Sequence, residues 1–131
     1  MQIPENTELW ENPTSVAWID KEGILCSISR KGPQPTIEES KREMERFRER
    51  FGDKKFCMLI DITNGSTSTS KEARDFAAEE IPKLTKAIAM ISNSALSRMA
   101  VNLFFGLKPP SYPAKIFDNE KDAREWLKQY L

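Results

Sequence analysis

Residues that could do chemistry gather at one junction near the middle of the chain. An apolar run over 56–60 ends at Asp61, and the segment 62–65 leads into a tract of hydroxyl residues only, 66–70. A helical pattern begins at Lys71. A phosphate on a hydroxyl beside a helix N-terminus would meet unpaired backbone amides and the positive end of the helix dipole. We therefore take this junction as the first candidate for a phosphorylation switch or a partner-binding site.

The candidate residues at this junction are all polar, and each also has a plain structural explanation. Serine and threonine are common in loops and as helix N-caps, and an aspartate that ends a strand can accept hydrogen bonds from the amides of the following turn. No second carboxylate lies close to Asp61 in the sequence, so an acid–base pair is not indicated. The candidates are Asp61, Thr63, Asn64, Ser66, Thr67, Ser68, Thr69 and Ser70.

A second group of residues could line an apolar pocket or a partner surface. It consists of Phe104, Phe105, Leu107 and Tyr112. Phe104 and Leu107 share an apolar stripe with Leu96, Met99, Ala100 and Leu103 on an expected helix, and the pattern predicts that this stripe packs in the core. Phe105 lies off the stripe and is expected to be exposed.

The composition argues against an enzyme. The chain has no histidine, which removes the usual general base, the Ser-His and Cys-His pairs and the commonest transition-metal ligand. Cys26 and Cys57 both lie in apolar strand patterns, so we expect two buried, unbridged thiols and no metal site. Because there is also no Gly-rich phosphate loop and no nucleophile elbow, we expect neither a cofactor nor catalysis.

The charge balance narrows the choice of partner. Twenty basic and twenty acidic residues give a formal net charge of zero, which argues against nucleic acid and against an anionic membrane surface as the main partner. No apolar run approaches the roughly 20 residues that span a bilayer, and the segment 1–5 does not resemble a signal peptide. We expect a cytoplasmic protein that binds another protein, with a homodimer as an open alternative.

Periodicity and turn residues predict the elements that position these residues. Residues 1–13 read as an arm anchored by Trp10, and residues 14–131 as a single domain. Strands are expected over 15–19 and 24–28, which form a hairpin, over 56–62, which shows no alternation, over the all-apolar segment 87–91, and over 114–117. The predicted fold is α/β, with the order ββαβαβαβα: a five-stranded mixed sheet with helices on both faces.

Four helices are expected, and each has an N-cap signal. Thr36 with Glu39, and Thr69 with Glu72, have the spacing of capping boxes; Asn93 or Ser94 precedes the third helix, and Asp118 or Asn119 the fourth. The fourth helix carries Ala123, Trp126, Leu127 and Tyr130 on one side, so Trp126 is expected to be buried.

This order resembles the STAS family, the anti-sigma-factor-antagonist-like domains, and their relatives with a CRAL-TRIO-like lipid-binding fold. The segment 114–127, AKIFDNEKDAREWL, looks like the short strand, acidic cap and Ala-x-x-Trp-Leu ending of small bacterial members, and 56–62 looks like their central strand.

The resemblance implies a non-enzymatic regulatory module that binds a protein through the loop and helix after the central strand. The family's phosphorylated residue stands in an Asp-Ser-Ser-Gly-like sequence, which this chain replaces with 66–70. The alternative function is a small apolar-ligand or lipid carrier with a pocket between the sheet and the third helix.

Overall fold

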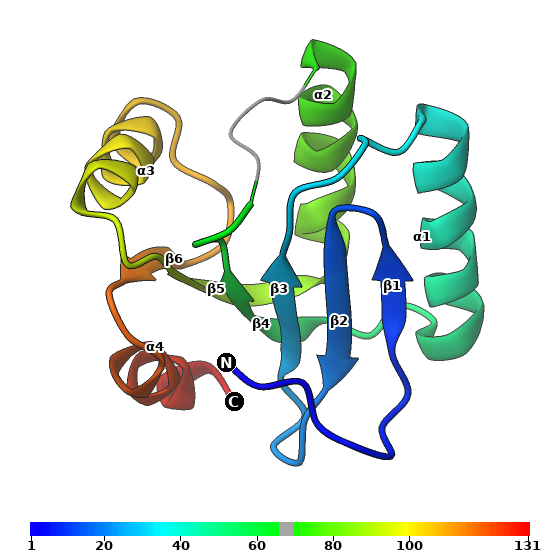
Figure 1. The fold of residues 1–131 in the computed structure, drawn as a ribbon, viewed down its shortest axis with the longest axis horizontal. Coiled ribbons are helices and arrows are strands. Elements are labelled where there is room, and N and C mark those ends of the chain that lie inside the picture. The colour runs from blue at the N-terminus through cyan, green and yellow to red at the C-terminus, as the bar shows by residue number, and fades with distance from the viewer. Residues whose placement is uncertain (66–69) are drawn as a thin grey trace.

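The structure is a computed structural model, and it describes residues 1–65 and 70–131. The described chain forms one sheet whose strands lie side by side in chain order (Figure 1). These are β1 (Trp10–Asn12), β2 (Ser15–Ile19), β3 (Leu25–Ser29), β4 (Phe56–Asp61), β5 (Thr85–Ile91) and β6 (Ala114–Phe117). The pairs β1–β2 and β2–β3 are antiparallel, and β3 to β6 run parallel.

Four α-helices connect and cover these strands. They are α1 (Ile37–Phe51), α2 (Lys71–Glu80), α3 (Ala95–Leu107) and α4 (Glu120–Leu127), and two short 3-10 helices follow α2 and α4 at Ile81–Leu84 and Lys128–Tyr130. As predicted, the fold is α/β with a mixed sheet. The expected count of five strands is wrong, because the sheet has six.

The strand that was not expected is β1, which lies in the segment predicted to be an arm. It has only three residues, which is too short for an alternating pattern to stand out from its polar surroundings. It is held by a tight turn in which Asn12 Oδ1 accepts hydrogen bonds from Thr14 N at 2.8 Å and Thr14 Oγ1 at 2.9 Å. The expected anchor is correct: the Trp10 ring lies 5.9 Å from Phe47 and 5.4 Å from Phe51, both on α1.

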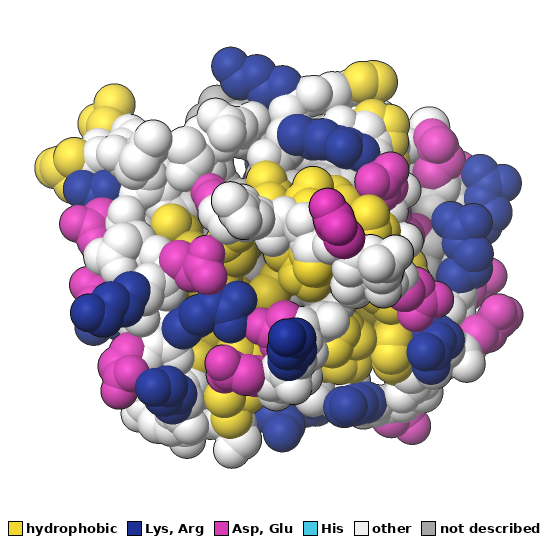
Figure 2. All heavy atoms as spheres, turned by 60° about the horizontal axis from the view of Figure 1, so that its bottom comes forward, with side chains coloured by type: hydrophobic (Ala, Val, Ile, Leu, Met, Phe, Trp, Pro, Cys, Tyr) yellow, Lys and Arg dark blue, Asp and Glu magenta, His cyan; other side chains and the backbone are white. Residues whose placement is uncertain are grey.

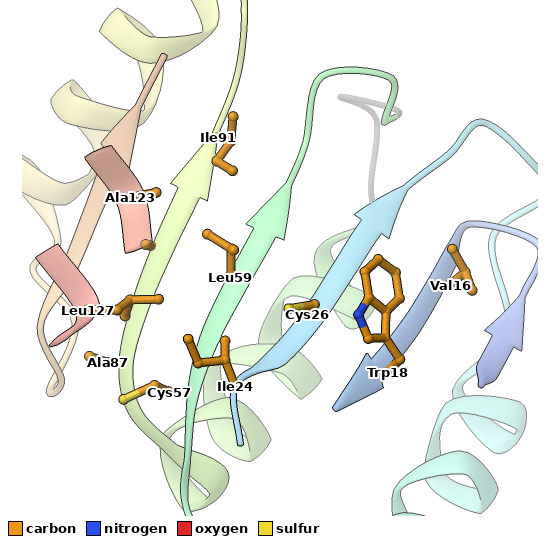
Figure 3. Packing of buried hydrophobic residues seen from close by; sticks show 11 residues of the cluster. Val16, Trp18, Ile24, Cys26, Cys57, Leu59, Ala87, Ile91, Ala123 and Leu127 are labelled. Atoms are coloured by element: carbon orange, nitrogen blue, oxygen red, sulfur yellow. The ribbon is translucent and has the colours of Figure 1, made fainter. Parts of the chain in front are cut away.

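The two faces of the sheet have separate cores. On one face, Phe56, Met58 and Ile88 pack against Phe47 and Phe51 of α1 and against the residues that follow α2. On the other face, strand residues of alternate positions pack against Ala123 and Leu127 of α4 (Figure 3). Since alternate residues of β4 and β5 serve both cores, these strands are apolar at every position over 56–60 and 87–91, as the sequence predicts.

The predicted N-caps are observed at three of the four helices. The capping box of Thr36 and Glu39 has both of its hydrogen bonds, Ser94 Oγ accepts from Ser97 N, and Asn119 Oδ1 accepts from Asp122 N. The second helix differs: its N-cap is Ser70, whose hydroxyl accepts from Ala73 N. The expected N-cap, Thr69, is therefore wrong by one residue, and because the third helical residue after Ser70 is Ala73, there is no capping box at α2.

Candidate functional site

The loop after β4 begins with a carboxylate that shapes the turn. Asp61 Oδ1 accepts a hydrogen bond from Thr63 N at 3.0 Å, and Oδ2 lies 3.8 Å from the nitrogen of Met1. The Asp61 side chain is 19% exposed. Between the two alternatives that the sequence left open, this geometry favours the structural role for Asp61.

The same loop is tied to the start of α3. Thr63 Oγ1 accepts a hydrogen bond from Asn93 N at 3.3 Å, while the Ile62 amide donates to Ile91 O at 2.9 Å. Gly65 lies so close to β3 that an added Cβ would be 2.9 Å from Ser29 Cβ. The loop is thus held by two hydrogen bonds and passes close to β3, and of the candidates in this part of it only Asn64 is exposed.

Of the candidates in the hydroxyl tract, only Ser70 is among the described residues. Ser66, Thr67, Ser68 and Thr69 lie outside the described residues. Ser70 is described, is exposed, and caps α2 through its Oγ at 3.1 Å from Ala73 N. Its hydroxyl is therefore occupied in a structural role.

The apolar stripe of α3 is on the surface, contrary to the sequence-based expectation. We call this set the α3 stripe; its members are Leu96, Met99, Ala100, Leu103, Phe104 and Leu107. Its five large side chains are 56–77% exposed. Figure 2 shows hydrophobic side chains protruding at the left end of the molecule, where α3 lies in Figure 1.

The structure reverses the exposure predicted for Phe104, Phe105 and Leu107. Phe104 is 56% and Leu107 74% exposed, whereas Phe105 is half-buried. The physical reason is that α3 turns its other side, with Ser97, Val101 and Phe105, toward the protein. Within the described chain, α3 contributes no side chain to either core cluster.

A cleft separates α3 from α2 and contains two hollows. One, of about 470 Å³, is lined by Phe104, Phe105 and Tyr112 together with α2 residues. The other, of about 760 Å³, reaches from Ser97 and Val101 to the loop after β4 and to the ends of β2 and β3. Both are bounded by Ala77 and Ile81, so they lie side by side, and together we call them the α2–α3 cleft. Burial raises the pKa of Tyr112 at its wall.

A charged cluster between the β2–β3 hairpin and α4 escaped the sequence analysis. Arg124 of α4 donates to Asp20 Oδ2 and to Glu120 Oε2, both at 2.8 Å, and its other nitrogen lies 3.8 Å from Cys26 Sγ. Asp20 Oδ1 also accepts from Ile24 N at 3.0 Å, which closes the β2–β3 hairpin. Because Asp20 and Arg124 are 104 positions apart in the sequence, no local pattern could have paired them.

The electrostatics of this cluster fit a structural role. Burial would lower the pKa of Arg124, but the hydrogen bonds to Asp20 and Glu120 outweigh it and raise the pKa. Burial, followed by the nearby Asp20 carboxylate, raises the pKa of Cys26 to about 12. The Cys26 thiol is thus protonated and poorly nucleophilic at neutral pH.

Across residues 1–65 and 70–131, no three Cys, Asp or Glu side chains lie close enough together to hold a metal ion. None of the helices in these ranges is both long and apolar enough to cross a membrane. Cys26 and Cys57 are buried and unbridged, as predicted.

The architecture defines a class of fold that is known from a solved structure. An uncharacterised protein of the DUF3478 family from Shewanella loihica PV-4, described as having a SpoIIAA-like fold, matches with a TM-score of 0.62 and 20% identity, over 90% of this chain and 97% of that chain. The fold is therefore SpoIIAA-like, and so STAS-like, as the sequence predicted.

Residues 17–131 match the family described as "Domain of unknown function (DUF7793)", and the chain belongs to this family. A protein with unknown function from Arthrobacter sp. FB24 is 28% identical over 86% of this chain and 92% of that chain, with a TM-score of 0.30. The comparison with curated proteins finds no match.

Proposed function

We propose that the protein is a non-enzymatic STAS-like module that binds a protein partner through α3 and the adjoining loop after β4. The observation that carries this proposal is the α3 stripe. Large apolar side chains scattered singly over a surface are ordinary, whereas a continuous row along one helix marks an interaction surface. Of the large apolar side chains exposed in the described chain, five belong to this one helix and three to the rest.

The loop after β4 and α3 belong to the same edge of the molecule. The Thr63–Asn93 hydrogen bond joins the loop to the residue that lies just before the Ser94 cap. This edge lies beyond the carboxyl ends of the parallel strands, where α/β proteins commonly place their ligands. The surface that the sequence analysis assigned to the loop and α2 is therefore proposed here to be centred on α3, with the loop at its margin.

Phosphorylation remains part of the proposal for this edge. A phosphate on the tract 66–70 would stand next to the N-terminus of α2, where the helix dipole favours negative charge by about 0.3–1 kcal/mol. The intact mass of protein isolated from its own cells, before and after phosphatase treatment, tests this directly. If phosphatase leaves the mass unchanged, there is no stable phosphorylation.

A capture experiment with matched variants tests the binding surface. The bait is the full chain, in wild-type form, as Leu103→Arg on the stripe, or as Asn102→Arg at an exposed position of the same helix outside the stripe. We expect at least one protein to be enriched on wild type and on Asn102→Arg and lost on Leu103→Arg. Equal capture by all three baits would contradict the proposed surface. Equal urea midpoints of the three baits serve as the folding control.

An apolar-ligand carrier is the second candidate, and the α2–α3 cleft favours it. The hollow of about 470 Å³ falls in the size range of small-molecule pockets, and its wall includes Phe104, Phe105 and Tyr112, three of the four residues picked from the sequence. Native mass spectrometry of protein purified without detergent would detect a retained lipid or other apolar ligand. Phe105→Ala, on the cleft side of α3, should then release it, while Leu107→Ala on the outer side should not.

A further inference from the structure

We propose that the partner of the α3 stripe is a second copy of this chain, and that the two α3 helices pack antiparallel about a twofold axis. This inference rests on the proposed function, because it names the occupant of the same surface. The reasons lie in the order of residues along the stripe, in its charge and in its area.

The stripe is self-complementary when it is read in opposite directions. We consider an antiparallel pair centred between Val101 and Asn102. A stripe residue that lies a given number of positions before this centre then faces the residue that lies the same number of positions after it in the second copy. Leu96 then faces Leu107 of the second copy, Met99 faces Phe104, and Ala100 faces Leu103. A small residue opposite a large one at the centre lets the helices approach closely and interlock. A twofold interface requires this kind of self-complementarity, since each copy contributes the same patch.

The charge of α3 suits a second copy better than an anionic lipid surface. Arg98 is the only charged residue between Ala95 and Leu107, and its Nη1 donates to the backbone oxygen of Ser92 at 2.8 Å, away from the stripe. A helix that lies in a membrane surface normally has a polar face rich in lysine and arginine, which α3 lacks. The stripe itself carries no charge, so two copies could meet without repulsion.

The exposed area is also sufficient for a dimer. Five large side chains that are 56–77% exposed offer on the order of 600 Å² per copy, so a pair that covered them completely would bury roughly 1,200 Å², the lower end of the range for stable interfaces. An interface of this size predicts a dimer that dissociates on dilution.

Sedimentation velocity of the full chain over a range of concentrations tests the state of assembly. Wild type and Asn102→Arg should shift toward twice the 15.1 kDa protomer mass as concentration rises, and Leu103→Arg should stay monomeric. A wild type that is monomeric up to high-micromolar concentration, or a dimer that survives Leu103→Arg, would overturn the inference. If wild type is monomeric while Leu103→Arg still loses a captured protein, only the homodimer fails and the proposed function stands.

Cysteine cross-linking tests the antiparallel register. In the proposed pair, residue 96 of one copy lies beside residue 107 of the other, whereas the two residues 96 are about 16 Å apart along the helices, too far for a disulfide. A mixture of Leu96→Cys and Leu107→Cys chains should therefore form disulfide dimers at least tenfold faster than either chain alone. The native thiols are buried and give little background. Equal rates in the mixture and in the separate chains would refute this arrangement.

Discussion

Leu127→Ala should be among the most damaging single substitutions in this protein. Leu127 is 0% exposed and lies in the core cluster beneath α4. Its neighbours in that cluster include Ala87 and Ala89 of β5, which are short side chains on a central strand and cannot move in to fill a void. Most of the cavity should therefore persist, which places the loss in the upper half of the range for Leu→Ala, about 3–5 kcal/mol.

Urea unfolding followed by circular dichroism measures this loss. With a denaturant slope of about 2 kcal/mol per molar urea, which is typical for a domain of this size, the midpoint should fall by roughly 1.5–2.5 M. Leu127→Met keeps most of the volume and should cost less than about 1.5 kcal/mol. Glu125→Ala changes an exposed residue of the same helix and should shift stability by no more than about 0.5 kcal/mol.

The comparison of these variants can refute the reasoning. If Leu127→Ala unfolds at the same urea concentration as Glu125→Ala, α4 does not hold the core on this face. If Leu127→Met is as damaging as Leu127→Ala, then shape rather than lost volume governs this position, and the cavity argument fails.

Two further predictions concern titratable groups. Burial raises the pKa of both Cys26 and Cys57, so native protein at pH 8 should react with a thiol reagent far more slowly than unfolded protein. The unfolded protein should show two reactive thiols. A rapid reaction of the native protein would contradict the burial of these thiols. The pKa of Glu39 is lowered, chiefly because its carboxylate accepts a hydrogen bond from the Thr36 amide, so its contribution to stability is present above the ordinary value of 4.5 and lost as the pH falls through the lowered pKa. An NMR titration should show this low pKa in wild type and a partial rise toward 4.5 in Thr36→Ala, which removes the hydroxyl contribution but keeps the Thr36 amide; equal values in the two proteins would show that the Thr36 hydroxyl does not act on Glu39.

The parts of the fold that local chemistry specifies were predictable. Thr36 and Glu39 are three positions apart, and a capping box needs no other information. The uninterrupted apolar run at 56–60 requires cover on both faces, which places β4 inside the sheet. Strand β1 was missed because its three residues become a strand only through pairing with β2 and packing of Trp10 on α1.

The candidate site shows what periodicity leaves undetermined. Spacing establishes that Leu96, Leu103 and Leu107 share one side of α3, and this is correct. It does not determine whether the protein offers that side anything to pack against, and the part of the chain that the structure describes leaves that side exposed. Trp126 is a milder case: it lies on the predicted side of α4 and contacts Phe117 and Tyr130, yet it is half-buried and Leu127 is the deeper residue.

The strict chain order of the strands has a consequence for synthesis. Each strand pairs with the one made just before it, so the sheet can be extended strand by strand as the chain leaves the ribosome. The face that carries Cys57, Leu59 and Ala89, however, is covered by α4, which follows all six strands. Until α4 emerges, a nascent chain with a complete sheet would still expose this apolar face. Exposed apolar faces of this kind bind chaperones and promote aggregation. The emergence of α4 is thus the step at which this face is first protected.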